Sequence, residues 1–153
     1  MIPDVYNTSK GVGMLLKKLK TLLSVYDFID FALLFGSCAN GTQKALSDID
    51  VGIHTHRSIS LLEQGRIIAE LEDALGRKID LVLLNDLYKK DALLAFRIVD
   101  KHQPILCRNN DAYVDFKTYT YKYYFDVQPM YEMFDKALFE RLKNGTYAKA
   151  QAS

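Results

Sequence analysis

The stretch Gly36–Ile53, GSCANGTQKALSDIDVGI, places two aspartates where an apolar, strand-like run begins. Residues two apart on a strand share a face, so Asp48 and Asp50 point to one side while Ile49 and Val51 point to the other. Two like charges at the entrance to a core repel each other, and each resists leaving water. A divalent cation would compensate both charges. Oxygen ligands of this kind suit Mg²⁺, which also binds the phosphates of a substrate.

A third aspartate interrupts the next strand-like run, Lys78–Leu84, which reads KIDLVLL. Strands joined by one helix are often neighbours in a sheet, so we expect Asp80 to complete a trio of carboxylates with Asp48 and Asp50. Three acids can hold two metal ions about 3.5–4 Å apart, the arrangement that serves in-line phosphoryl transfer. The trio therefore predicts a metal site suited to that chemistry.

The pair Gly36-Ser37 supplies what such a site lacks, a place for phosphate. Gly36 has no side chain, so a phosphate can approach the backbone closely. Ser37 and the amides after it stand at an expected helix start, where free N–H groups favour anions, and the Ser37 hydroxyl can donate as well. No Gly-Lys-Ser/Thr follows, so the pair is not a P-loop.

Each of these features has a plainer explanation when it is taken alone. Asp48 can be a turn residue after Ser47, and Asp50 a satisfied acid at a strand end. The ordered set is far more specific: a strand, Gly-Ser, a short loop, Asp-x-Asp, and then Asp80 in the next strand. We therefore interpret the three acids as metal ligands.

Two histidines and a cysteine near these motifs are interpreted as structural or surface residues. His54 and His56 straddle the end of the second strand, but no Cys or His partner lies at zinc spacing, so we expect surface histidines. Cys38 lies inside the Gly-Ser loop with no base beside it, so we expect a small packing residue.

Composition bounds the class of protein. The chain has 153 residues and a net charge of +1, so it fits one domain and carries no bulk basic field that would imply a nucleic-acid partner. Cys38 and Cys107 are too few for a disulfide framework, which favours reduced thiols. The opening MIPDVYNTSK lacks the apolar core of a signal peptide, and no apolar run approaches the roughly 18 residues of a membrane span. We expect a cytoplasmic protein with no membrane partner.

The hydrophobic pattern predicts an α/β (α+β) fold, with a small mixed sheet and flanking helices that cover mainly one face. We expect one domain over residues 1–143, with a core over 10–108, a C-terminal helical segment over 111–143, and a disordered tail over 144–153. The expected elements are a helix from an N-cap at Ser9 to about Tyr26; strands over 28–35, 49–54 and 78–84; a helix over 60–75 with a Ser60–Glu63 capping box and an end at Gly76; a short helix over 91–101; an edge strand over 104–107; and a long helix that Pro129 kinks or divides.

The last helical segment is heavily aromatic: YVDFKTYTYKYYFDVQPMYEMFDKALF, from Tyr113. One stripe at helical spacing is expected to pack on the sheet: Phe116, Tyr123, Val127, Met130, Phe134 and Leu138. Several tyrosines do not fit that stripe, among them Tyr121, Tyr124 and Tyr131. Tyrosine is enriched at protein interfaces, so a partner surface is the alternative to a thick core-facing stripe.

With these motifs in place, GSCANG followed by SDIDVGI resembles the signature of the polymerase-β-like nucleotidyltransferase superfamily. The short chain and the segment KIDLVLLND look most like the minimal nucleotidyltransferases, a stand-alone branch often paired with a HEPN-domain partner. The resemblance covers about residues 10–108. It implies that Gly36 and Ser37 bind nucleotide phosphates, that Asp48 and Asp50 hold both metal ions, and that Asp80 joins the catalytic metal.

One departure from the family pattern concerns position 40. Many relatives carry Arg where this chain has Asn40, so any phosphate or loop contact of that Arg is lost here.

The resemblance also implies an activity. We expect a Mg²⁺-dependent enzyme with two ions per site that moves AMP from ATP to a hydroxyl. Asp80 would help to activate that hydroxyl. The implied acceptor is a tyrosine of a HEPN-type toxin, which makes this chain an antitoxin. Two alternatives stay open: nucleotidyl transfer to a small molecule, and a non-catalytic antitoxin that neutralises its partner by binding.

Overall fold

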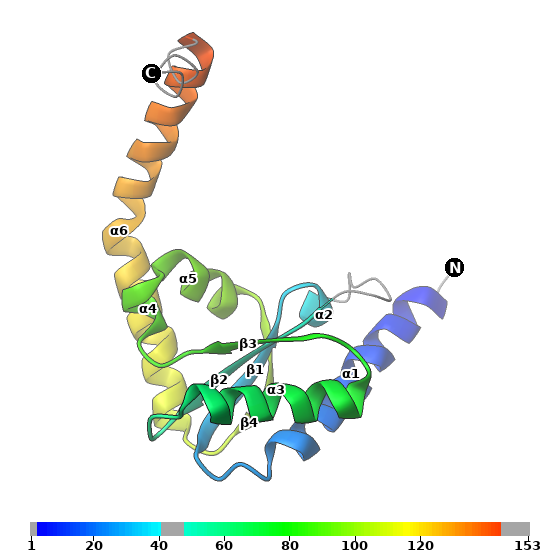
Figure 1. Ribbon diagram of the computed structural model, residues 1–153. Coiled ribbons are helices and arrows are strands. Elements are labelled where there is room, and N and C mark those ends of the chain that lie inside the picture. The colour runs from blue at the N-terminus through cyan, green and yellow to red at the C-terminus, as the bar shows by residue number, and fades with distance from the viewer. Residues whose placement is uncertain (1–2, 41–47, 145–153) are drawn as a thin grey trace.

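The computed structural model describes residues 3–40 and 48–144. Within them, no helix combines the length and the apolar composition that a membrane crossing requires. The elements follow one another as shown in Figure 1: α1 (Pro3–Leu23), β1 (Ile29–Phe35), α2 (Ser37–Asn40), β2 (Ile49–Thr55), α3 (Leu61–Leu75), β3 (Ile79–Leu83), α4 (Leu87–Lys90), α5 (Ala92–Asp100), β4 (His102–Cys107) and α6 (Asn110–Asn144).

The four described strands form one mixed sheet in the order β3-β2-β1-β4. Strand β1 is antiparallel to both β2 and β4, whereas β2 and β3 are parallel. The C-terminal end of β1 therefore meets the N-terminal ends of β2 and β3 at the same end of the sheet, and Figure 1 shows α2 there. The expected position of β4 at an edge is confirmed, and α4, a single turn after β3, was not predicted.

Both faces of the sheet are covered, so the expectation of helices mainly on one face is wrong. On one face, α1 and α3 contribute Leu19, Leu23, Ile67 and Leu71 to a core that includes alternate residues of β1 and β2. On the other face, residues of α4, α5 and α6 pack against Phe31 and Leu33. The reason lies in β1, which is buried at every position from Ile29 to Leu34 and needs apolar partners on both sides.

The ends of α3 lie where side chains and a glycine close to them in the sequence favour a helix end. The predicted capping box is confirmed, because the Ser60 side chain accepts from the Glu63 amide and the Glu63 side chain accepts from the Ser60 amide. Gly76 ends α3 in the left-handed conformation, as expected. Ser9 is not an N-cap, because α1 already begins at Pro3. Proline is well tolerated in the first turn of a helix.

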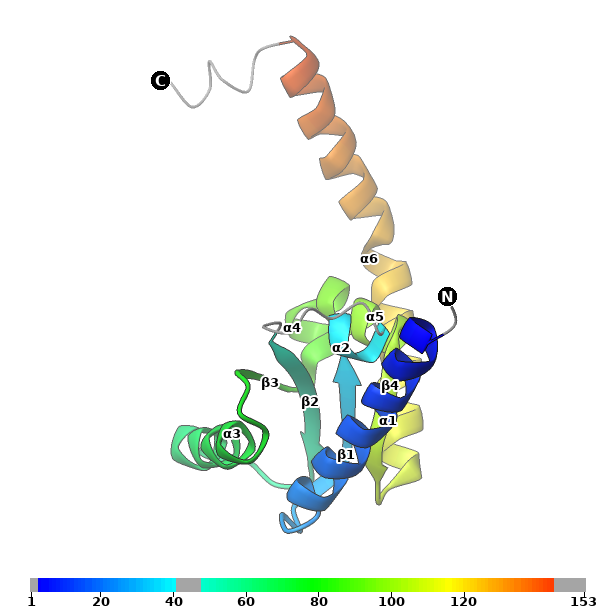
Figure 2. The ribbon, with the colours of Figure 1, turned by 90° about the vertical axis from the view of Figure 1, so that its right-hand side faces the viewer.

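Helix α6 is much longer than the sheet it packs against. It runs for 35 residues through Pro129, which does not divide it. A helix of that length spans about 50 Å, whereas a seven-residue strand such as β1 spans about 23 Å. Figures 1 and 2 show the second half of α6 projecting away from the rest of the molecule.

The aromatic stripe of α6 consequently reaches the core only at its start. Phe116 is buried, but Tyr123 and Met130 are exposed, so the prediction that the whole stripe packs on the sheet is wrong for these two. The side chains of Tyr131, Phe134 and Leu138 lie outside the described part, as do the segment 41–47 with Ser47 and the tail 145–153. The expectation of a disordered tail is therefore untested.

Candidate active site

The two strands that carry the predicted acids are neighbours, and the acids are directly opposite each other. Asp50 is the second residue of β2, Asp80 is the second residue of β3, and they pair in the parallel ladder. Paired positions point to the same face of a sheet, so the two carboxylates meet. A side-chain hydrogen bond joins them. The expected proximity of Asp50 and Asp80 is confirmed.

The charge of Asp50 is costly in this position. The pKa of this half-buried carboxyl is raised from 3.8 to about 6, mainly by burial and in addition by the charges of Asp80 and Asp48 and the hydrogen bond with Asp80. Asp80 is exposed, and so is Asp48, which immediately precedes β2. The site therefore concentrates negative charge around one partly desolvated acid, and a cation would relieve that cost.

Gly36 lies against the same acid. Phe35, the last residue of β1, pairs with Asp50 across the ladder, and Gly36 turns the chain immediately afterwards with φ of 73°. A Cβ atom built on Gly36 would lie 2.1 Å from Oδ2 of Asp50. Only glycine meets both conditions, a left-handed backbone and direct contact with the acid, so the backbone of the Gly-Ser turn lies directly against the Asp50 carboxylate.

The segment after Gly36 is tied to the start of β2 through Cys38. This cysteine is fully buried, and its Sγ lies 3.5 Å from both the backbone oxygen of Asp48, to which it donates, and the guanidinium of Arg77, which donates to it. Cys38 is thus a packing residue, as expected, that also connects α2 to the acid segment. Because α2 is a single turn, Ser37 has no helix dipole of any length behind it.

The donor set fits Mg²⁺ bound together with a nucleotide. Among residues 3–40 and 48–144, no three His, Cys, Asp or Glu side chains form a ready-made metal site. Asp50 and Asp80 are the carboxylates that would hold the ion, with Asp48 beside them. Mg²⁺ typically takes one or two protein carboxylates and completes its shell with water and substrate phosphates. Two paired acids beside a glycine turn match that requirement.

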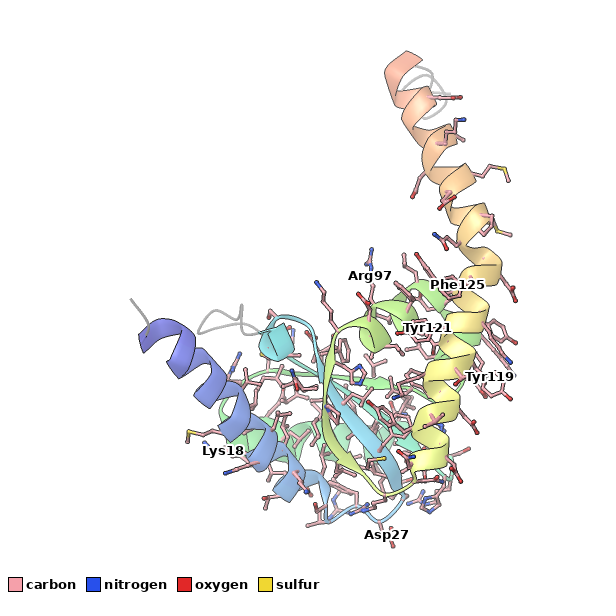
Figure 3. The ribbon with its side chains drawn as sticks, turned by 180° about the vertical axis from the view of Figure 1, so that it is seen from behind. Lys18, Asp27, Arg97, Tyr119, Tyr121 and Phe125 are labelled. Atoms are coloured by element: carbon pink, nitrogen blue, oxygen red, sulfur yellow. The ribbon has the colours of Figure 1, made fainter. Side chains whose placement is uncertain are left out.

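A cavity adjoining Gly36 is lined by two positively charged residues, Arg97 and Lys101, that the sequence analysis missed. The cavity has a volume of about 380 Å³ and is lined by Phe35, Gly36, Leu94, Arg97, Ile98, Asp100 and Lys101. Figure 3 shows Arg97 pointing outward from α5. The signal was present in the sequence, because Arg97 and Lys101 are four residues apart at the end of an expected helix and so share a face.

The two histidines lie toward the far end of β2, away from the acid pair. His54 stacks on Phe31 with ring centroids 4.9 Å apart, and its Nδ1 lies 2.9 Å from Oδ2 of the buried Asp30. Nδ1 of His56 lies 3.3 Å from Oδ1 of the same carboxylate. The interpretation as surface histidines holds for the exposed His56 and is wrong for His54, which is a packing residue.

Comparisons with known proteins agree with this geometry. The model of the family "Polymerase beta, Nucleotidyltransferase" matches residues 17–111. Two proteins of Methanocaldococcus jannaschii, each named "Putative protein adenylyltransferase", are 36% identical to this chain. One match extends over 75 residues, which is 49% of this chain and 77% of the relative, and the other over 81 residues, which is 53% and 83%.

Solved structures share the fold at lower sequence identity. A crystal structure of a toxin-antitoxin with AMP-PNP has a TM-score of 0.70 and 22% identity, and the match covers 81% of this chain and 98% of that one. A structure of tri-AMPylated HEPN toxin with MNT antitoxin from Shewanella oneidensis has a TM-score of 0.67 and 18% identity, with coverage of 84% and 98%. The family match spans the Gly-Ser turn, all three aspartates and α5. The chain therefore belongs to the polymerase β nucleotidyltransferase family.

Proposed function

We propose that this protein transfers AMP from ATP to a hydroxyl of a partner protein, a tyrosine of a HEPN-type toxin, and that it thereby acts as an antitoxin. The observation that carries the proposal is the register pair Asp50–Asp80 directly against the glycine turn at Gly36. The names of the archaeal relatives support adenylyl transfer to protein. The structural neighbours are antitoxins in complex with toxins, one of them a tri-AMPylated HEPN toxin, which supports a toxin as the acceptor.

In this proposal the glycine turn binds the nucleotide and the acids bind the metal ions. Gly36 and Ser37 hold the triphosphate of ATP, while Asp48, Asp50 and Asp80 hold two Mg²⁺ ions. Bound Mg²⁺ would stabilise charge on the phosphates and lower the pKa of the acceptor hydroxyl. The hydroxyl oxygen attacks the α-phosphorus, the bond from that phosphorus to the α,β-bridging oxygen breaks, and pyrophosphate leaves. The Asp80 carboxylate accepts the hydroxyl proton.

Arg97 and Lys101 add a role for α5 in the same reaction. Both line the cavity beside Gly36, and their charges exceed that of Asp100, the acid in the same wall. A net positive wall next to the glycine turn suits the phosphates that leave as pyrophosphate. We assign these two residues to binding of the triphosphate.

A non-catalytic antitoxin is the second candidate, because α6 exposes apolar side chains that a partner would cover: Val114, Tyr119, Tyr121, Tyr123, Phe125, Met130 and Met133. Binding and catalysis can share this surface. Transfer to a small molecule is less well supported, because the curated relatives are named as adenylyltransferases of protein and the structural neighbours are toxin-antitoxin complexes.

The decisive experiment compares wild type with Asp80→Asn. Each is incubated with the HEPN-type partner, ATP and Mg²⁺, and the partner is weighed by intact mass spectrometry. Wild type is expected to add the mass of AMP less water per modified site. Asp80→Asn should bind the partner but modify it at least about 100-fold more slowly, because it loses a metal ligand and the proton acceptor. Asp73→Asn, at an exposed position of α3, is the matched control and should behave as wild type.

Two results would contradict the enzymatic proposal. One is that neither wild type nor Asp80→Asn adds mass while both protect cells from the toxin, which would make the protein an occluding binder. The other is that ATP with Mg²⁺ neither raises the melting temperature nor binds in calorimetry, since a ligand that binds the native state must stabilise it.

A further inference from the structure

Two cavities on the helical face share one arginine. The cavity beside Gly36 has Arg97 in its wall. A second cavity, of about 230 Å³, lies between α5 and α6 and is lined by Leu93, Arg97, Tyr124, Gln128, Glu132 and Asp135. Because Arg97 lines both, the two cavities adjoin each other at this residue.

The second cavity has the opposite charge from the first. Glu132 and Asp135 come from the projecting part of α6, and Arg97 is the only cation in this lining. Within the described part of the chain, neither Arg97 nor Asp135 forms an ion pair, and the Glu132 carboxylate accepts only a hydrogen bond of 3.2 Å from Gln128. The acidic wall is therefore available to a cation from another molecule.

The side chain of Tyr124, which is packed against another aromatic ring, forms one side of this cavity. The ring of Tyr124 stacks on that of Phe96 with centroids 3.8 Å apart and an interplanar angle of 12°. Tyr121 meets the same Phe96 ring edge-on at 5.9 Å, and Phe125 next to Tyr124 is 60% exposed. Figure 3 labels Tyr121 and Phe125 on α6 and Arg97 on the neighbouring α5. The faces of aromatic rings favour cationic side chains.

We infer that the cavity between α5 and α6 binds a segment of the acceptor protein that carries a lysine or arginine near the reactive hydroxyl. The inference rests on the proposed function, because it takes the acceptor to be a protein. Glu132 and Asp135 pair with the basic side chain, Tyr124 supports the segment, and the chain then passes Arg97 toward Gly36. The acidic wall disfavours nucleic acid, whose phosphates it would repel.

Two fluorescein-labelled peptides test the inference with the full-length protein. One is Lys-Gly-Tyr-Gly-Lys and the other is Glu-Gly-Tyr-Gly-Glu, and binding is followed by fluorescence anisotropy. Wild type is expected to bind the lysine peptide about fivefold or more tightly than the glutamate peptide, the scale of two exposed ion pairs. The double variant Glu132→Gln/Asp135→Asn removes both charges with little change of shape and should abolish that preference.

A matched control separates this cavity from the general charge of α6. Asp126→Asn/Glu140→Gln removes two charges from exposed positions of the same helix that do not line the cavity, and it should keep the preference. Equal binding of the two peptides to wild type, no binding of either, or equal loss in both double variants overturns the inference. Calorimetric ATP binding and AMP addition to the partner report on the proposed function separately, since neither variant pair touches the acid site.

Discussion

A Cβ atom added at Gly36 and the carboxylate oxygen of Asp50 would occupy the same space, so the structure can hold only one of them. The turn after β1 is closed by a glycine in the left-handed region, and the acid of β2 fills the volume where any other side chain would begin. The close approach ties the turn that we propose binds phosphate to the acid that we propose binds metal.

Gly36→Ala should destabilise the protein and abolish nucleotide binding. The new methyl group would displace the Asp50 carboxylate, and alanine at φ of 73° adds strain, so we expect a loss of at least about 2 kcal/mol in the free energy of unfolding. Gly76→Ala is the matched control, because Gly76 is also left-handed, with φ of 64°, but has nothing within 4 Å of a built Cβ. It should cost only about 1 kcal/mol and leave ATP affinity unchanged, as measured by urea denaturation and calorimetry.

The second prediction concerns pH. Folding raises the pKa of Asp50 from 3.8 to about 6, so between these values the native state binds more protons than the unfolded state. Stability should therefore fall as pH rises from about 4 to 6 and stay lowered above 6. Because the group is partly exposed, we expect an effect of about 1–2 kcal/mol rather than the full value of the shift.

Asp50→Asn provides the test of that pH effect. The variant should be more stable than wild type at pH 7 and about equally stable at pH 4, in melting curves recorded from pH 4 to 7.5. It should also lose most of the stabilisation that wild type gains from ATP with Mg²⁺, since it lacks the charge that the ion relieves. A stability difference that stays constant with pH would show that Asp50 does not carry the cost of the site.

The third prediction assigns a purely structural role to the Asp30–His54 pair. Asp30 is 7% exposed and His54 is its closest side-chain partner, at 2.9 Å. Asp30→Ala leaves the imidazole without that partner and should cost about 2 kcal/mol of unfolding free energy. ATP affinity should not change, because the pair lies toward the far end of β2. A parallel loss of ATP binding at full folding would contradict this assignment.

The fourth prediction separates packing from docking on α6. Tyr124 stacks on Phe96, so Tyr124→Ala should lower the unfolding free energy by about 1–3 kcal/mol, measured by denaturation. Phe125 is 60% exposed, so Phe125→Ser should leave stability within about 0.5 kcal/mol and weaken binding of the partner, measured by calorimetry. If Phe125→Ser binds the partner as well as wild type, this part of α6 is not a docking surface.

The sequence alone was sufficient for the parts of the site that obey short-range rules. Strand alternation and the usual adjacency of strands joined by one helix predicted that Asp50 and Asp80 would meet, and the register confirms it. The Ser60–Glu63 capping box and the end of α3 at Gly76 were likewise readable, because a few neighbouring residues satisfy the free amides and carbonyls of a helix end. In each case the deciding interaction is local or follows from a single connection.

The tertiary structure decided what depends on relative lengths and on elements distant in sequence. Whether the apolar stripe of α6 is buried or exposed depends on how far the sheet extends beneath the helix. The hydrophobic periodicity of α6 does not specify that length. Arg97 lines the cavity beside Gly36 only because α5 packs against β1, and the contact between Gly36 and Asp50 needs the antiparallel register that pairs Phe35 with Asp50. The hydrophobic pattern of the sequence indicates which face of each element is buried. The hydrophobic effect has no direction, however, so it does not specify which element covers that face. The packing of whole elements therefore determines which charged and aromatic groups meet.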